Sequence, residues 1–318
     1  MKPALHEVDE RTNLTASNKF ELLLFRLGES ARGKNRELFG INVFKVREIL
    51  VMPPITEMAN ASPNVMGVAN IRGQIIPVID LAAVVGCKPS QGLSILLVTE
   101  FARTTQAFAV EEVNEIVRLD WKQVLSAEGQ GGGLVTSIAR LDGDKADTRL
   151  AQVLDVEQIL REVMPQDKSI DEFKTTGPQI ILPKGTVILA ADDSATARSM
   201  IEQGLTAMGL PYIMTKTGQE AWDKLQSLSD FAVTEGKTVH DKVALVLTDL
   251  EMPEMDGFTL TRNVKGDQRF RNIPVVIHSS LTGSANEDHV TSAGADAYIA
   301  KFKAEELAQT LRTVLALH

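Results

Sequence analysis

Residues 245–257 read Leu245-Val246-Leu247-Thr248-Asp249-Leu250-Glu251-Met252-Pro253-Glu254-Met255-Asp256-Gly257. The short apolar run at the start is typical of a strand that is buried on both faces of a sheet. It ends at an acid, a proline and an Asp-Gly turn, which places Asp249 at the carboxyl end of that strand. Ligands bind at this edge in open parallel α/β sheets, so Asp249 is a candidate nucleophile for an incoming phosphoryl group.

The sequence around this stretch alternates between strand-like and helical patterns. From Thr186 onward these patterns occur in the order 187–191, 195–208, 218–228, 243–247, 273–278, 296–300 and 303–316. Such alternation is typical of parallel sheets that are covered by helices on both faces. We therefore predict that residues 186–318 form an α/β domain with a doubly wound, parallel, five-stranded sheet.

Polar side chains stand at the ends of several of these strands. Asp192 and Asp193 follow the strand at 187–191, Asp249 the strand at 243–247, Ser279 the strand at 273–278 and Lys301 the strand at 296–300. Taken singly, they have ordinary explanations as a helix cap, a strand-end hydroxyl and a surface lysine. Because the carboxyl ends of parallel strands meet at one edge, their coincidence favours a functional site. In such a site Lys301 and the Ser279 hydroxyl would contact phosphoryl oxygens.

The three acids predict a metal site. Carboxylates at one edge repel one another unless a hard divalent cation that prefers oxygen ligands lies among them, and Mg²⁺ meets this need. We expect Asp193, Asp249 and the backbone carbonyl of Glu251 to bind the ion directly. Asp192 is expected to hold a water molecule that the ion coordinates.

The N-terminal half has a different pattern. Between residues 19 and 165, short β-like runs separated by Gly, Pro and Asn predict an all-β domain, built as barrels or as a sandwich. Residues 1–18 are polar and are expected to form a flexible N-terminus. Residues 166–185 are broken by Pro and Gly and are expected to form a linker that permits motion between the halves.

Composition excludes several classes of function. The 318 residues carry a net charge of −9, and neither half has the clustered cations that nucleic-acid binding needs. The single Cys87 excludes an intrachain disulfide, and no Cys/His spacing resembles a zinc site. The N-terminus lacks the apolar core of a signal peptide, and no uncharged apolar run approaches the ~20 residues that span a bilayer. We expect a cytoplasmic protein without direct membrane insertion.

Three blocks stand out in the N-terminal half. They read Phe39-Gly40-Ile41-Asn42-Val43-Phe44-Lys45-Val46-Arg47-Glu48-Ile49, Val65-Met66-Gly67-Val68-Ala69-Asn70-Ile71-Arg72-Gly73 and Gln74-Ile75-Ile76-Pro77-Val78-Ile79-Asp80-Leu81. These blocks resemble the CheW-like coupling domain of bacterial chemotaxis. The resemblance implies paired five-stranded barrels that bind a CheA-type histidine kinase and the cytoplasmic tips of methyl-accepting chemoreceptors. By motif position, it implies that the partner-binding residues are Val46, Glu48, Asn70 and Arg72.

The second half carries a further set of motifs. It contains the paired acids Asp192 and Asp193, the block 249–257, Ser279 thirty positions after Asp249, and Lys301 twenty-two positions after Ser279. These features resemble the receiver domain of two-component response regulators. The resemblance implies that Asp249 accepts a phosphoryl group from a kinase phosphohistidine and that Tyr298 is an aromatic switch. For Tyr298, a plain role in the core is an equally ordinary explanation.

This half departs from the receiver pattern in two places. Asp193 and Asp249 are 56 positions apart, about a dozen more than is usual, and the surplus is the polar stretch Ser229–Asp241. We expect it to form a loop at the edge opposite the acids. Lys301 is followed by Phe302, where the family usually has a proline in a cis peptide. Because a non-proline cis bond costs ~2.5–4 kcal/mol, this turn is expected to be either trans or strained.

A CheW-like half joined to a receiver resembles the CheV family of chemotaxis adaptors. The resemblance implies a scaffold rather than an enzyme, although a receiver can autodephosphorylate. It would couple chemoreceptors to the CheA kinase at receptor–kinase arrays and be regulated by phosphorylation of Asp249. Two alternatives stay open: a Mg²⁺-dependent phosphohydrolase that uses Asp249, and a scaffold whose receiver is never phosphorylated. The first is disfavoured because Met252-Pro253 follows Glu251, where the phosphohydrolase motif has a threonine.

Overall fold

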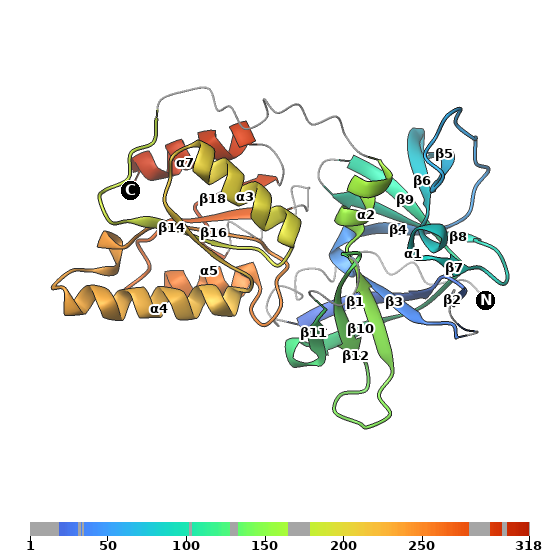
Figure 1. The fold of residues 1–318 in the computed structure, drawn as a ribbon, viewed down its shortest axis with the longest axis horizontal. Coiled ribbons are helices and arrows are strands. Elements are labelled where there is room, and N and C mark those ends of the chain that lie inside the picture. The colour runs from blue at the N-terminus through green and yellow to red at the C-terminus, as the bar shows by residue number, and fades with distance from the viewer. Residues whose placement is uncertain are drawn as a thin grey trace.

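The computed structural model describes residues 19–30, 33, 35–101, 104–127, 133–164, 179–279, 293–300 and 304–317. Within these residues the chain forms two domains. The N-terminal domain consists mainly of strands, and the C-terminal domain alternates strands and helices (Figure 1). This arrangement confirms the predicted fold class, an all-β domain followed by a doubly wound α/β domain.

The first sheet of the N-terminal domain has six strands. Its order is β10 (Glu112–Asp120), β1 (Lys19–Arg26), β3 (Leu38–Asn42), β13 (Leu150–Leu154), β12 (Val135–Arg140) and β11 (Val124–Ser126). The described sheet therefore has one strand more than the expected five. Strand β1 is apolar and buried along most of its length because it contributes to two clusters of core residues on its opposite faces.

The second sheet curls until its edges meet. Its order is β4 (Val46–Val51), β8 (Ile95–Phe101), β9 (Thr104–Val110), β6 (Gln74–Asp80) and β5 (Val65–Ile71). Thr56, which follows edge strand β4, forms an antiparallel bridge with Val68 of the opposite edge strand. A Cβ atom on Gly67 would lie 2.2 Å from the Thr56 carbonyl oxygen, so only glycine permits this approach. The closure matches the expected barrel.

The described part of the N-terminal domain also contains two short strands and two short helices. They are the paired strands β2 (Glu29–Ser30) and β7 (Cys87–Lys88) and the helices α1 (Leu81–Val85) and α2 (Val156–Val163). Helix α2 begins where Asp155 accepts hydrogen bonds from the backbone of Glu157 and Gln158, the usual role of an aspartate at a helix start. A 3₁₀ turn, η2 (Val43–Lys45), links β3 to β4, and another, η3 (Trp121–Gln123), follows β10.

The C-terminal domain is a parallel sheet with helices on both faces. Its order is β15 (Tyr212–Thr215), β14 (Val187–Ala191), β16 (Val243–Thr248), β17 (Val275–Ser279) and β18 (Ala297–Ala300). One face packs against α3 (Ala195–Ala207) and α7 (Ala304–Leu317), and the other against α4 (Gly218–Thr234) and α5 (Gly257–Gly266). None of the described helices is both long and apolar enough to cross a membrane.

The surplus stretch before β16 is folded rather than a loop. Helix α4 continues to Thr234, because the buried positions Leu225, Ser229 and Ala232 keep helical spacing beyond the predicted end at residue 228. The 3₁₀ turn η5 (Val239–Asp241) follows, with the Asp241 carboxylate accepting from the backbone N–H of Thr238. The prediction of a loop was wrong because the stretch is mostly polar, and its composition does not show that some positions are buried at helical spacing.

Candidate functional site

Three acids converge at the carboxyl edge of the parallel sheet. Asp192 and Asp193 follow β14 and Asp249 follows β16, and these two strands are neighbours. Their carboxylate oxygens can all lie within 4.8 Å of one another. Asp192 and Asp249 are buried, whereas Asp193 is half-buried. We call residues 192–194 and 249–257 the acid edge.

Backbone hydrogen bonds hold the acids in place. The Asp249 N–H donates to the Ala191 carbonyl at 2.9 Å, which ties the two strand ends together. The Leu250 N–H donates to Asp249 Oδ1 at 2.8 Å, and the Ser194 N–H donates to Asp192 Oδ1 at 2.9 Å. The last two bonds orient the carboxylates of Asp249 and Asp192, so these two acids are pre-organised.

Arg198 and Gly257 contact the backbone of the acid edge. Arg198 Nη1 on helix α3 donates to the carbonyls of Asp192 (3.0 Å) and Asp193 (2.8 Å). Gly257 opens helix α5 directly against the acceptor loop, and a Cβ atom there would lie 2.1 Å from the Asp249 carbonyl oxygen. Its N–H donates to the Leu250 carbonyl at 2.9 Å. The Asp-Gly pair at 256–257 therefore allows the close approach of helix and loop.

Of the other predicted site residues, the structure describes Ser279 and Tyr298 but not Lys301. Ser279 ends strand β17, next to β16, and is fully buried. Tyr298 on β18 packs against the buried pair Leu250 and Ile277. Lys301 and its turn to Phe302 lie outside the described residues, so their expected geometry stays a prediction.

The donor set of the acid edge fits Mg²⁺. Asp192, Asp193 and Asp249 offer carboxylate oxygens, which this hard cation prefers, and they lie close enough to share one ion. Without a cation, three negative charges so close together would repel one another. The predicted set of acids is therefore compatible with the metal site.

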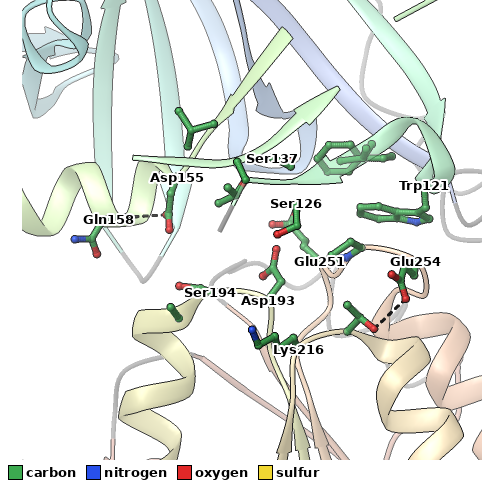
Figure 2. A pocket seen from close by; sticks show the side chains of 18 of the residues that line it. Trp121, Ser126, Ser137, Asp155, Gln158, Asp193, Ser194, Lys216, Glu251 and Glu254 are labelled. Atoms are coloured by element: carbon green, nitrogen blue, oxygen red, sulfur yellow. Dashed lines mark hydrogen bonds between the residues drawn. The ribbon is translucent and has the colours of Figure 1, made fainter. Parts of the chain in front are cut away.

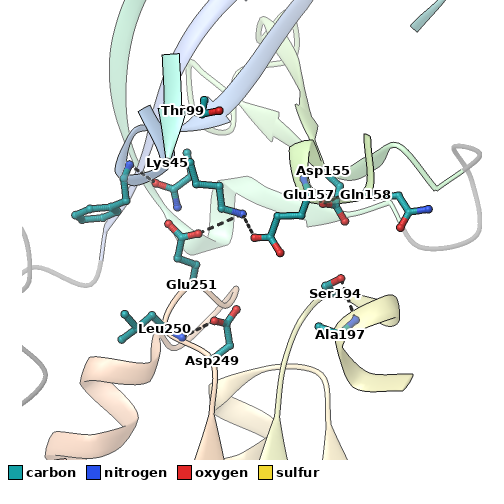
Figure 3. A network of polar contacts seen from close by, with 12 residues as sticks. Lys45, Thr99, Asp155, Glu157, Gln158, Ser194, Ala197, Asp249, Leu250 and Glu251 are labelled. Carbon is teal, nitrogen blue, oxygen red and sulfur yellow. Dashed lines mark hydrogen bonds and ion pairs between the residues drawn. The ribbon is translucent and has the colours of Figure 1, made fainter. Parts of the chain in front are cut away.

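The acid edge faces the N-terminal domain. Glu251 extends from it toward Lys45 of η2, while Asp249 lies below them (Figure 3). Lys45 Nζ lies 2.9 Å from Glu157 Oε1 of its own domain and 3.3 Å from Glu251 Oε2 of the other. Burial alone would lower the pKa of Lys45, but the charges of Glu157 and Glu251 outweigh it and raise that pKa. Lys45 therefore bridges the two domains as a cation.

Two cavities lie between the domains. The smaller, about 50 Å³, is lined by residues of both domains, among them Asp249, Glu251 and Lys45. The larger, about 610 Å³, lies beside Asp193, with Ser126 and Ser137 on its opposite wall (Figure 2). Sequence reasoning missed Lys45 because nothing in its local pattern indicates that it meets a strand end two hundred residues away.

The predicted partner-binding residues divide into exposed and buried positions. Arg72 and Gly73 form the turn between β5 and β6, with φ of 51° and 84°, values that a type I′ turn requires. Arg72 projects into solvent and pairs with Glu48 at 2.9 Å, whereas Asn70 accepts from the Gly73 N–H at 3.0 Å. Val46 is only 9% exposed and belongs to the core, so it offers little surface to a partner.

Comparisons with known proteins cover both domains. Residues 21–164 match the CheW-like domain family, and residues 188–312 match the response regulator receiver domain family. The crystal structure of the scaffolding protein TtCheW from Thermoanaerobacter tengcongensis is 24% identical, covers 47% of this chain and 97% of its own, and has a TM-score of 0.40.

Whole-length relatives contain both domains in one chain. Chemotaxis protein CheV2 of Helicobacter pylori is 28% identical over 98% of this chain and 100% of its own length. Chemotaxis protein CheV1 of the same organism is 29% identical over 100% of both chains. With its CheW-like domain followed by a receiver domain, this chain belongs to the CheV type of chemotaxis protein.

Proposed function

We propose that the chain is an adaptor that couples chemoreceptors to a CheA-type histidine kinase and is regulated by phosphorylation of Asp249. The observation that carries the proposal is the acid cluster at the end of central strand β16, in a chain that also contains a CheW-like domain. Residues 19–165 would serve as the coupling unit and residues 186–318 as its phosphorylated regulator, joined by the linker 166–185. Its place would be at receptor–kinase arrays in the cytoplasm.

The proposed reaction is transfer of a phosphoryl group to Asp249. A carboxylate oxygen attacks phosphorus, the new P–O bond forms as the P–N bond to the kinase histidine breaks, and the imidazole nitrogen keeps the electron pair. Bound Mg²⁺ supplies positive charge that offsets the charge of the phosphoryl oxygens. Asp193, Asp249 and the Glu251 carbonyl would hold the ion, and Asp192 would orient one of its waters.

Three further residues would stabilise the phosphorylated state. The Ser279 hydroxyl and the Lys301 ammonium would contact phosphoryl oxygens. Tyr298 would respond to the shift of Ser279 by moving into the space that it leaves. The packing of Tyr298 against Leu250, which follows Asp249 directly, supports this role.

The labelling test separates the adaptor from its alternatives. The full chain is incubated with a histidine kinase carrying labelled phosphate, with Mg²⁺ or with a chelator. The proposal expects one stable phosphoryl group per chain, only when Mg²⁺ is present. Sustained turnover of small phosphate esters would instead favour a phosphohydrolase, and failure to label would favour a scaffold with an unphosphorylated receiver.

The coupling unit would contact its partners through the Arg72 hairpin. We propose that Arg72, Glu48 and Asn70 contribute side chains to the kinase and chemoreceptor surfaces, and that Val46 supports them from the core. A non-glycine residue in the left-handed region costs roughly 1–2 kcal/mol, yet Arg72 occupies it with φ of 51°. The backbone at Arg72 is strained and its side chain is exposed. This supports a role for the side chain itself in contacting a partner.

Arg72→Asn tests this role without straining the turn. Asparagine tolerates the left-handed region better than arginine, and the lost pair joins an exposed Arg72 to a half-buried Glu48, so the stability of the fold should change by at most about 1 kcal/mol. Binding to receptor–kinase assemblies should weaken about tenfold, which corresponds to about 1.4 kcal/mol. Co-sedimentation of the full chain with receptor-containing membranes and kinase measures this change.

A matched control uses the other sheet of the same domain. Arg118 on β10 is also exposed and also pairs with a glutamate, Glu21. Arg118→Gln should therefore leave binding unchanged. Equal loss of binding in both variants would contradict a specific role for the Arg72 hairpin.

A further inference from the structure

The described polar contacts between the domains gather around the acid edge. Lys45 pairs with Glu251, two residues after Asp249. Thr196 Oγ1, in the first turn of the helix that follows Asp193, donates to Gln158 Oε1 of helix α2 at 3.1 Å. The N-terminal domain therefore covers the same edge that a phosphodonor would have to approach.

The 3₁₀ turn η2 makes the central contact. Phe44 packs against Leu250 and Ile277, the buried pair that Tyr298 also contacts. Its conformation is fixed by Asn42, whose Oδ1 accepts from the Phe44 N–H at 3.0 Å. An apolar side chain and a cation thus stand side by side on one short turn and meet the two residues that follow Asp249.

The covered edge leaves room for small molecules only. Asp249 is 4% exposed, and the cavity between it and Lys45 holds about 50 Å³, enough for a few waters. The neighbouring cavity of about 610 Å³ is lined by Asp193 and Glu251 but not by Asp249, and it can admit a small phosphate compound close to the acid edge. A protein domain that presents a histidine needs the edge itself, which η2 and α2 occupy.

We propose that the N-terminal domain is a built-in competitor of the protein phosphodonor: η2 docks on the acid edge and must leave before a donor domain reaches Asp249. Undocking breaks the Lys45–Glu251 pair, but Lys45 keeps Glu157 as its partner, so no charge is left buried alone. This makes docking reversible. The inference rests on the proposed phosphorylation of Asp249 and adds a means of controlling access to it.

Two donors of different size test the competition on the full chain. Lys45→Gln removes the cation that spans the domains and keeps a similar side-chain length. Its labelling by a phosphorylated kinase should be faster than that of the wild type by roughly tenfold, within the usual range of coupling between sites. Labelling by acetyl phosphate, which can enter the larger cavity beside the acid edge without the whole edge being uncovered, should rise much less.

A second interface variant and a control variant distinguish the loss of docking from misfolding. Gln158→Ala removes the described hydrogen bond between α2 and Thr196, and it should also speed labelling by the kinase more than labelling by acetyl phosphate. Lys122→Gln changes an exposed lysine on the neighbouring turn η3 and should change neither rate. Unchanged rates with the kinase in both interface variants, or an equal rise with both donors, would overturn the proposal.

Hydrogen exchange tests docking independently of phosphorylation. The amides of residues 249–257 should exchange more slowly in the wild type than in Lys45→Gln, because docking shields them. Equal exchange in the two proteins would overturn the docking itself. Absence of labelling from either donor, together with a clear difference in exchange, would refute the proposed function while leaving the docking intact.

Discussion

Asp249→Asn is expected to abolish phosphoryl labelling of the chain with either a kinase or acetyl phosphate as donor. The amide of asparagine is a far weaker nucleophile than a carboxylate and cannot form the acyl phosphate. Labelled wild type should lose its phosphate to hydroxylamine, which cleaves acyl phosphates, and the variant should carry no label to lose. Autoradiography of the full-length proteins in Mg²⁺ measures both results.

The variant should fold as well as the wild type. Asparagine Oδ1 can still accept the hydrogen bond from the Leu250 N–H, and one charge is removed from a cluster of three acids. The melting temperature without Mg²⁺ should therefore be equal or higher. Glu254→Gln provides the matched control, because Glu254 is an exposed acid of the same loop and its variant should label normally. Label on any other residue of Asp249→Asn would contradict the assignment.

Gly257→Ala is expected to slow labelling by about 10- to 100-fold, because small displacements of reacting groups have effects of this size. The added Cβ would lie 2.1 Å from the Asp249 carbonyl oxygen and 3.0 Å from Leu250 Cα, both backbone atoms that cannot turn away. The acceptor loop must then shift and carry Asp249 with it. The strain should also cost about 1–3 kcal/mol of stability, which thermal unfolding measures.

The other end of the same helix provides the control. Gly266 closes helix α5, and a Cβ atom there would meet nothing within 4 Å. Gly266→Ala should label at the rate of the wild type and unfold at an equal or higher temperature. If Gly257→Ala labels as fast as Gly266→Ala, the close approach of helix and acceptor loop does not control the position of Asp249.

Much of the receiver half could be predicted because its signals are local. A buried apolar strand that ends in an acid and a turn is visible within a dozen residues, and parallel strands bring such ends to one edge. For this reason Asp192, Asp193 and Asp249 could be grouped from their positions in the sequence alone. The surface of α4 was harder to predict, since Ser229 continues a buried stripe with a polar side chain.

The contacts between the domains could not be predicted in the same way. Arg47 and Glu48 interrupt the apolar pattern of strand β4, so the sequence around Lys45 does not indicate where η2 ends and the strand begins. The pairing of Lys45 with Glu251 depends on how two separate cores are oriented, which no periodicity records. The left-handed conformation of Arg72 likewise follows from the hairpin that surrounds it rather than from its own preference.

The folded surplus at the end of helix α4 offers a practical attachment site. This end points away from the N-terminal domain in Figure 1, and the chain turns at Gly236, where φ is 69° and nothing lies within 4 Å of a Cβ position. Exposed turns of this kind accept inserted sequence with little effect on the surrounding fold. A fluorescent protein or epitope inserted at residue 236 would lie far from both proposed partner surfaces and from the acid edge. It could therefore report where the protein resides in living cells.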